Sequence, residues 1–242
     1  MIREIGVVMR KELKEMGVEG GGRRARLTPL VGLLVAGGLF PFNFGVRYVL
    51  PETMLLMGML LPALFVLPIV ADTFAGERER HTLETLLATR LPDRAILFGK
   101  LGAIVFYAFV LSVASLLLGV ITVNVAHPEA RPLLAPAAIY ARTLIEIVLV
   151  ATLMTGIGLL ISLGASTVRQ AQQRFSMVLL VPMLIPAVIG GLPARLREPI
   201  REMLASGRLT PARLLLGALV VLNVVILGIA MQRFQRSRLI TA

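Results

Sequence analysis

Six stretches of the chain carry roughly 20 mostly apolar residues each, and most charged residues fall between them. About 20 apolar residues is the length that an α-helix needs to cross the hydrocarbon core of a bilayer. The pattern predicts an all-α integral membrane protein with six transmembrane helices. Pro41 and Asn43 interrupt the first stretch and Pro182 and Pro186 the fifth, so these two helices should kink or break. The six stretches are 28–47, 53–71, 101–126, 143–165, 175–192 and 211–231.

The composition agrees with membrane insertion. Of 242 residues, 57% are apolar and 16% charged, and the mean hydropathy is +0.84. Counted with Gly and without Tyr, the apolar share is about 65%, against about 45–50% in soluble domains. An ordinary soluble enzyme and a disordered chain are therefore excluded. Cysteine is absent, which excludes a disulfide framework, a thiol nucleophile and a thiolate metal site.

The distribution of positive charge predicts the orientation. Both termini fall on one side of a six-helix chain, and 17 of the 25 Lys and Arg lie on that side. The positive-inside rule makes it the cytoplasmic side of a cell membrane, inner or plasma. If the stretch 175–192 only dipped into the membrane, the count would be slightly more favourable, so charge alone does not decide between five and six spans. The cations form no long tract and few aromatics accompany them, so no nucleic-acid partner is expected.

The first 22 residues predict an amphipathic helix that lies in the membrane interface. The face opposite its apolar side chains carries basic residues suited to an anionic leaflet. Gly20 to Gly22 end the helix. The pattern leaves open whether this helix is an anchor or a lever that also touches a partner. At 100° per residue, its apolar side chains fall within about 80° of arc; they are Ile2, Ile5, Met9, Leu13 and Met16.

The segment 72–100 is the largest polar connection between two predicted spans. Its charges alternate in sign over 77–80, and leucines then recur at the i, i+3, i+4 spacing of one helical face. Pro92 and Asp93 end this helix and start the next, with Asp93 as the expected N-cap. Either the charges of this short helix are simply solvated at the membrane edge, or the helix docks in the groove of a partner protein.

The residues of this segment resemble a known family. Phe74-Ala-Gly-Glu-Arg-Glu-Arg-His-Thr-Leu-Glu-Thr-Leu-Leu-Ala-Thr, followed at 93–100 by Asp-Arg-Ala-Ile-Leu-Phe-Gly-Lys, is similar to the first cytoplasmic loop of type-2 ATP-binding-cassette (ABC) permeases. The resemblance is strongest to the drug and sodium-efflux exporter branch. That family usually has Gly where this chain has His81. The six spans and the amphipathic start also fit.

The resemblance implies a single permease domain over 1–242. It would hold spans 1 and 2 within 28–71, a coupling loop at 72–100, spans 3 and 4 within 101–165, and spans 5 and 6 within 175–231. An outer re-entrant or interfacial segment at 193–210 favours six spans over five. The loop would hold the coupling helix that contacts the ATPase subunit, through Glu77, Glu79, Arg80, Thr82, Leu83, Glu84, Leu86 and Leu87.

The chain lacks the residues of a nucleotide site. The Gly-Lys pair at 99–100 is followed by Leu101, and Arg94 stands where a Walker A loop needs its first Gly. The two histidines, His81 and His127, belong to no ligand cluster. No catalytic residue, metal or cofactor is therefore expected in this chain, and ATP and Mg²⁺ would bind to the partner subunit.

Three polar residues within spans are candidates for a substrate path or gate. Arg142 and Glu146 are four residues apart, so they can form a structural ion pair or line a path. Asn223 lies midway along the last span, where it bonds a neighbouring helix or takes part in transport. Asp72, at the end of the second span, is expected to pair with a loop arginine.

These observations predict the permease subunit of an ABC exporter whose substrate the sequence does not identify. Two copies, or one copy and a related half, would form the path, and two separate ATPase subunits would supply the energy. Two alternatives stay open. One is an ion-coupled secondary transporter, and the other is a non-transporting assembly or scaffold subunit.

Overall fold

The structure is a computed structural model that describes residues 1–16, 23–82, 92–128, 134–191, 195 and 211–234. Within these ranges the chain is helical and contains no strand, as the sequence predicts. Two short elements, the π-helix η2 and the 3₁₀-helix η3, lie between α-helices. The elements are α1 (Ile2–Lys14), α2 (Arg23–Leu34), η2 (Val35–Leu39), α3 (Phe40–Phe44), η3 (Gly45–Val49), α4 (Pro51–Val70), α5 (Asp72–Glu79), α7 (Asp93–Ala126), α8 (Ala137–Leu163), α9 (Val168–Gly191) and α11 (Pro211–Arg233).

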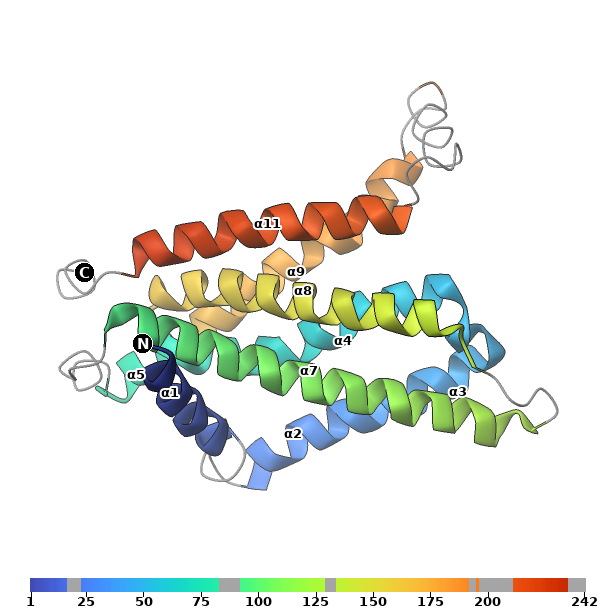
Figure 1. Cartoon of the computed structure of the whole chain (residues 1–242), viewed down its shortest axis with the longest axis horizontal. Coiled ribbons are helices and arrows are strands. Elements are labelled where there is room, and N and C mark those ends of the chain that lie inside the picture. The colour runs from blue at the N-terminus through green and yellow to red at the C-terminus, as the bar shows by residue number, and fades with distance from the viewer. Residues whose placement is uncertain (17–22, 83–91, 129–133, 192–194, 196–210, 235–242) are drawn as a thin grey trace.

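The long helices form a bundle, and α1 lies across one end of it (Figure 1). Helix α8 is central, since it packs against α4, α7, α9 and α11, and α1 packs on α7. Five helical runs of the described chain are long and apolar enough to cross a membrane, namely Pro29–Val49, Pro51–Glu79, Asp93–Ala126, Ala137–Leu163 and Arg213–Arg233. The predicted stretch 175–192 falls mostly within α9, whose side chains are described only to residue 180. The total of six spans therefore stays a prediction.

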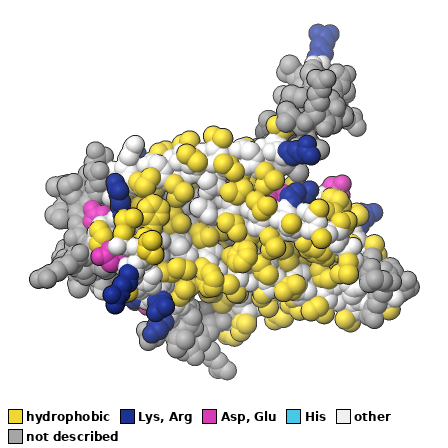
Figure 2. Space-filling model, in the orientation of Figure 1, with side chains coloured by type: hydrophobic (Ala, Val, Ile, Leu, Met, Phe, Trp, Pro, Cys, Tyr) yellow, Lys and Arg dark blue, Asp and Glu magenta, His cyan; other side chains and the backbone are white. Residues whose placement is uncertain are grey.

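Apolar side chains cover the bundle as well as fill it. Met57, Phe65 and Ile147 are buried between the helices, whereas Val221 and Val224 of α11 are more than 60% exposed. In the space-filling view, a broad hydrophobic belt separates the charged groups at the two ends (Figure 2). An apolar exterior of this kind is stable only in lipid, because in water it would associate. The chain is a multi-pass membrane protein.

Both ends of the described chain lie at the same end of the bundle (Figure 1). We call it the α5 end, because it holds α5 together with α1 and the start of α7. The ring of Phe234, the last described residue, lies 5.3 Å from that of Phe74 in α5. The termini therefore share a side, as expected, and their cytoplasmic location stays a prediction.

The first predicted span is interrupted one turn earlier than expected. The π-helix Val35–Leu39 precedes Pro41, and the chain then stays helical through Asn43. Because Pro41 has no N–H, the carbonyl of Gly37 loses its usual donor four residues on. Thr122 Oγ1 of α7 donates to that carbonyl instead, at 3.0 Å. Gly37 permits this approach, because a Cβ there would lie 2.8 Å from the Ser115 carbonyl.

Helix α7 starts eight residues before the predicted third span. Its first two turns, 93–100, contain polar residues and project beyond the apolar stretch. Asp93 is the first helical residue and Pro92 occupies the N-cap position, so the expected cap at Asp93 is one residue out. The predicted end of the first helix at Gly20 to Gly22 lies outside the described residues. So does the outer segment 193–210, apart from Arg195.

Candidate functional site

Helix α5 begins the predicted coupling loop and continues α4 after a break at Ala71. A break inside a bundle leaves backbone groups without helical partners, and buried groups of this kind need others. Ser162 of α8 supplies them. Its hydroxyl accepts the N–H groups of Phe74 and Ala75, each at 3.0 Å, and donates to the Ala71 carbonyl at 3.1 Å. The start of the loop is thereby fixed to α8.

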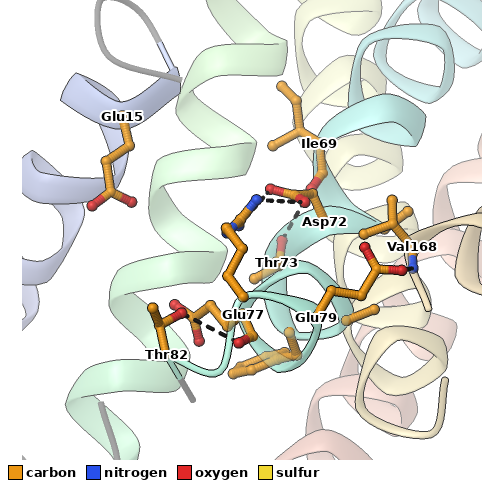
Figure 3. A network of polar contacts seen from close by, with 12 residues as sticks. Glu15, Ile69, Asp72, Thr73, Glu77, Glu79, Thr82 and Val168 are labelled. Atoms are coloured by element: carbon orange, nitrogen blue, oxygen red, sulfur yellow. Dashed lines mark hydrogen bonds and ion pairs between the residues drawn. The ribbon is translucent and has the colours of Figure 1, made fainter. Parts of the chain in front are cut away.

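Two of the alternating charges hold the connection between α8 and α9. Arg78 donates to the carbonyls of Ala165 and Leu163, at 2.5 and 3.0 Å, so a cation satisfies the carboxyl-terminal end of α8. The carboxylate of Glu79 accepts the N–H of Val168 at 3.0 Å, at the positive end of the dipole of α9. Glu79 and Val168 face one another in Figure 3. Charges that could have been merely solvated therefore bind neighbouring helices.

Asp72 and Arg80 pair across the length of α5, as expected for Asp72. The guanidinium donates to both carboxylate oxygens, at 3.2 and 3.0 Å. This hydrogen bonding with Asp72 raises the pKa of Arg80 above its usual value. Gly76 makes room for the pair, because a Cβ there would collide with the Asp72 carboxylate. Both side chains are about half exposed, so the pair fixes geometry more than it adds stability.

Helix α5 ends in a motif that calls for glycine. The Thr82 N–H donates to the Glu77 carbonyl at 2.9 Å, and the His81 N–H to the Arg78 carbonyl at 3.1 Å. This pair of bonds is the Schellman motif, in which the residue after the C-cap is left-handed. His81 has φ +55°, in that left-handed region. The glycine usual in the resembling loops would thus satisfy a backbone requirement that His81 meets at a cost.

We expect His81→Gly to stabilise this end of the protein by about 0.5–1 kcal/mol. The left-handed conformation costs a side-chain-bearing residue roughly 1–2 kcal/mol, and the greater freedom of Gly in the unfolded chain offsets part of the gain. Thermal unfolding of the purified protein and slower exchange of the Thr82 amide would show it. His81→Ala is the control, because it removes the imidazole but keeps the strain. An equal gain from both variants would contradict the backbone explanation.

A buried lysine joins α5 to α1 and α7. The Lys100 ammonium lies 2.8 Å from a carboxylate oxygen of Glu12 in α1 and 2.8 Å from one of Glu77 in α5. All three side chains are almost fully buried, with exposed fractions of 2% for Lys100, 9% for Glu12 and 11% for Glu77. The ammonium also lies 5.5 Å from the centre of the Phe74 ring, within range of a cation–π contact. One cation therefore holds two elements that are far apart in the sequence.

Helix α1 can reach Lys100 because the residue before this lysine is a glycine, Gly99. A Cβ on Gly99 would lie 2.6 Å from the Val8 side chain and 3.3 Å from the Ile5 carbonyl, whereas one on Gly102 would meet Met9 at an ordinary 3.6 Å. Val8 and Glu12 are the buried residues of α1, and neither was in the predicted apolar arc. The arc predicts an apolar face, but the buried residues lie beyond one edge of it.

The two glycines give a matched pair of substitutions. Gly99→Ala should displace α1 and cost about 1–3 kcal/mol of stability, the usual range for overpacking. Gly102→Ala should be neutral or slightly stabilising, because a helical Ala is preferred to Gly. Thermal unfolding measures both. Comparable losses from the two variants would show that close approach at Gly99 does not hold α1 in place.

The predicted ATPase-contact residues divide into two sets. Glu77, Glu79, Arg80 and Thr82 lie together at the α5 end, where Glu77 is buried and the other three are exposed. The exposed three are accessible to another subunit, and Glu79 at the same time binds Val168. The other four lie outside the described residues; they are Leu83, Glu84, Leu86 and Leu87. Contact with an ATPase subunit stays a prediction for all eight.

The polar residues of the spans lie away from this site. Arg142 Nε is 3.2 Å from the Glu146 carboxylate, near the opposite end of α8, and the Arg142 guanidinium also donates to the Pro51 carbonyl at 2.9 Å. Asn223 donates to the Leu149 carbonyl at 3.0 Å and so links α11 to α8. The expected ion pair and interhelical bond are both present. A role of these residues in a substrate path or gate stays a prediction.

Comparison with known families identifies this architecture. Residues 4–189 match the family model described as ABC-2 type transporter. The chain belongs to the ABC-2 type transporter family. The match runs from α1 into α9 and includes the elements of the α5 end other than the end of α11. No curated protein matches the sequence. The drug and sodium-efflux branch stays a prediction.

Membership indicates what kind of subunit the chain is. Permease domains of ABC-2 transporters are membrane components without a nucleotide site, and they generally work with an ATPase subunit and as dimers. Sequence reasoning missed Glu12 and Ser162 as parts of this site, and it treated Lys100 only as the last residue of the family-like loop and as part of a failed nucleotide loop. A lysine directly before an apolar run, with glycine before it, was the available signal for a buried partner.

Proposed function

We propose that this chain is the transmembrane permease subunit of an ABC exporter and that separate ATPase subunits drive it through the segment that follows α5. The observation that carries the proposal is the anchoring of α5. Within eight residues, this helix is joined to α8 by Ser162 and Arg78, to α9 by Glu79, and to α1 and α7 by Lys100. The sequence of the loop favours the drug and sodium-efflux branch.

The anchoring supports transmission of motion. A force applied to the segment 83–91 would act first on α5, because Thr82 is bonded to Glu77 at the end of that helix. Buried ion pairs are costly to break one partner at a time, so α5 should move together with α1 and the helices it contacts. Helix α4 also leads directly into α5, with only Ala71 between them. A small displacement at the loop would therefore reach several spans.

The energy source lies outside the chain. The sequence contains no Walker A loop, so ATP and Mg²⁺ would bind to ATPase subunits, two of them for a permease dimer. Contact with each would use the exposed Glu79, Arg80 and Thr82 together with Leu83, Glu84, Leu86 and Leu87. The second permease copy would be identical or a related half, and the substrate path would run along their interface.

The proposed topology has six spans and cytoplasmic termini. Helix α9 has 24 residues, which at 1.5 Å per residue is about 36 Å, long enough to cross the hydrocarbon core. The five apolar runs and α9 together put the α5 end and both termini on one side. The excess of Lys and Arg on that side supports the cytoplasm.

Purification of the tagged full-length chain from its own host's membranes tests this function. The expected result is a complex with a polypeptide that carries a Walker A sequence, in equal amounts, and ATP hydrolysis that stops when the Walker A lysine is replaced. ATP-dependent substrate movement into vesicles that contain the complex separates an exporter from a scaffold. A preparation without an ATPase, or a complex that never moves substrate, would contradict the proposal.

A further inference from the structure

The outward face of α1 carries three cations in a row. Arg3, Arg10 and Lys14 fall within about 40° of arc at 100° per residue, and all three are exposed. They lie opposite the buried Val8 and Glu12 on the same helix. We call these three residues the basic ridge. Among the described residues, none of the three forms an ion pair, whereas the acidic Glu4 and Glu15 of α1 are paired with the terminal amine and Lys11.

An apolar flank borders the basic ridge. Ile2, which is 86% exposed, lies on that flank with Gly6 and Leu13. In the space-filling view, dark-blue groups lie over α1 at the margin of the hydrophobic belt (Figure 2). A helix at this position can insert its apolar flank among acyl chains and hold its cations at the level of phosphate groups. The chemistry that fits the ridge is therefore the phosphodiester of an anionic lipid in the bilayer.

The other face of α1 leads to the coupling segment. Glu12 binds Lys100 at 2.8 Å, and Lys100 binds Glu77 at 2.8 Å. The backbone carbonyl of Glu77 in turn accepts both the N–H and the hydroxyl of Thr82. Two buried ion pairs and one helix end therefore connect α1 with the start of the segment 83–91.

We infer that α1 senses anionic lipid. Headgroups bound to the basic ridge set the position of α1, and the Glu12–Lys100–Glu77 contacts pass that position to the end of α5. The permease would then hold the end of α5, which precedes the coupling segment, in one position only when anionic lipid is bound. This inference rests on the proposed function only for the role of the coupling segment.

Hydrogen exchange of the full-length chain in lipid nanodiscs tests the inference. With phosphatidylglycerol in the disc, in place of phosphatidylcholine alone, we expect severalfold slower exchange of the amides in 72–82. Arg3→Gln/Arg10→Gln should abolish that difference and lower the preference for phosphatidylglycerol by about fivefold per charge removed. Arg169→Gln/Arg233→Gln is the matched control, because it removes two exposed cations of α9 and α11. It should leave the difference intact.

A second variant tests the relay separately. Glu12→Leu keeps the basic ridge and leaves Lys100 and Glu77 as a balanced pair, so the protein should fold and still prefer phosphatidylglycerol. Its 72–82 amides should no longer respond to the lipid. Equal exchange in both lipids for the unaltered chain, or a full response in either test variant, would overturn the inference. None of these measurements uses ATP, so their failure would leave the proposed export function standing. Failure of the export function would equally leave the lipid response of α1 standing.

Discussion

Replacing Lys100 with Met is expected to lower the free energy of unfolding by about 3–5 kcal/mol, the largest loss expected at the α5 end. Glu12 and Glu77 each lie 2.8 Å from the ammonium and are about nine-tenths buried. Without the cation, two carboxylates face one another away from water, and each loses its ion-pair partner. The contact with the Phe74 ring is lost as well.

Thermal unfolding of the purified protein measures this loss, and a compensating variant shows its cause. Replacing all three residues with Met should restore most of the stability, because a buried ionic cluster can often be exchanged for apolar side chains at little cost. Unfolding of Lys100→Met at the temperature of the unaltered protein would contradict the role given to Lys100. So would a triple variant no more stable than Lys100→Met.

The helices could be predicted well from the sequence because lipid leaves few choices. A backbone in hydrocarbon must satisfy its hydrogen bonds internally, so an apolar stretch of about 20 residues is nearly always a helix. Where the structure describes them, the predicted stretches fall on helical chain except at three terminal residues, Ala71, Gly164 and Ala165. The limits were less accurate at polar ends. Helix α7 extends back to Asp93 because hydropathy marks the membrane part of a helix and not the turns that project from it.

Packing between distant segments could not be predicted. The Gly37 carbonyl in the π-helix Val35–Leu39 is bonded by the hydroxyl of Thr122, 85 residues later in the chain, in place of the N–H that Pro41 lacks. Periodicity gave α1 an apolar face, but it could not say that α7 would cover Val8 and Glu12 and leave Ile2 exposed. Such details depend on a partner surface that a local pattern does not contain.

The sequence could indicate the segment of the candidate site but not its contacts with the neighbouring helices. The alternating charges of 77–80 marked this segment as a candidate docking helix, which stays a prediction. The expected pairing of Asp72 with a loop arginine is confirmed. The alternating charges could not show that Arg78 and Glu79 would bind the ends of α8 and α9, because those bonds require knowing which helix ends lie beside α5. The sequence shows that His81 replaces the glycine usual in similar loops. Its φ of +55° explains why glycine is usual there, because that left-handed conformation favours glycine.

Reversing the charge at Glu84 should separate the permease from its ATPase. Glu84 lies two residues after the exposed Thr82, in the segment that we propose docks in the partner's groove, where its carboxylate would meet a basic rim. A charge reversal there turns an attraction into a repulsion, and loss of a buried, bonded charge contact typically costs 2–5 kcal/mol or more. Association should fall by more than tenfold, while membrane insertion and thermal stability should be unchanged.

The amount of ATPase that co-purifies with each tagged permease chain tests the central claim most directly. The unaltered chain and Glu4→Lys, the same charge change on α1 at the same end of the bundle, should retain equimolar ATPase. Glu84→Lys should retain less than a tenth of it, with normal insertion into the membrane. Equal retention by Glu84→Lys and Glu4→Lys would contradict an exporter driven through this loop.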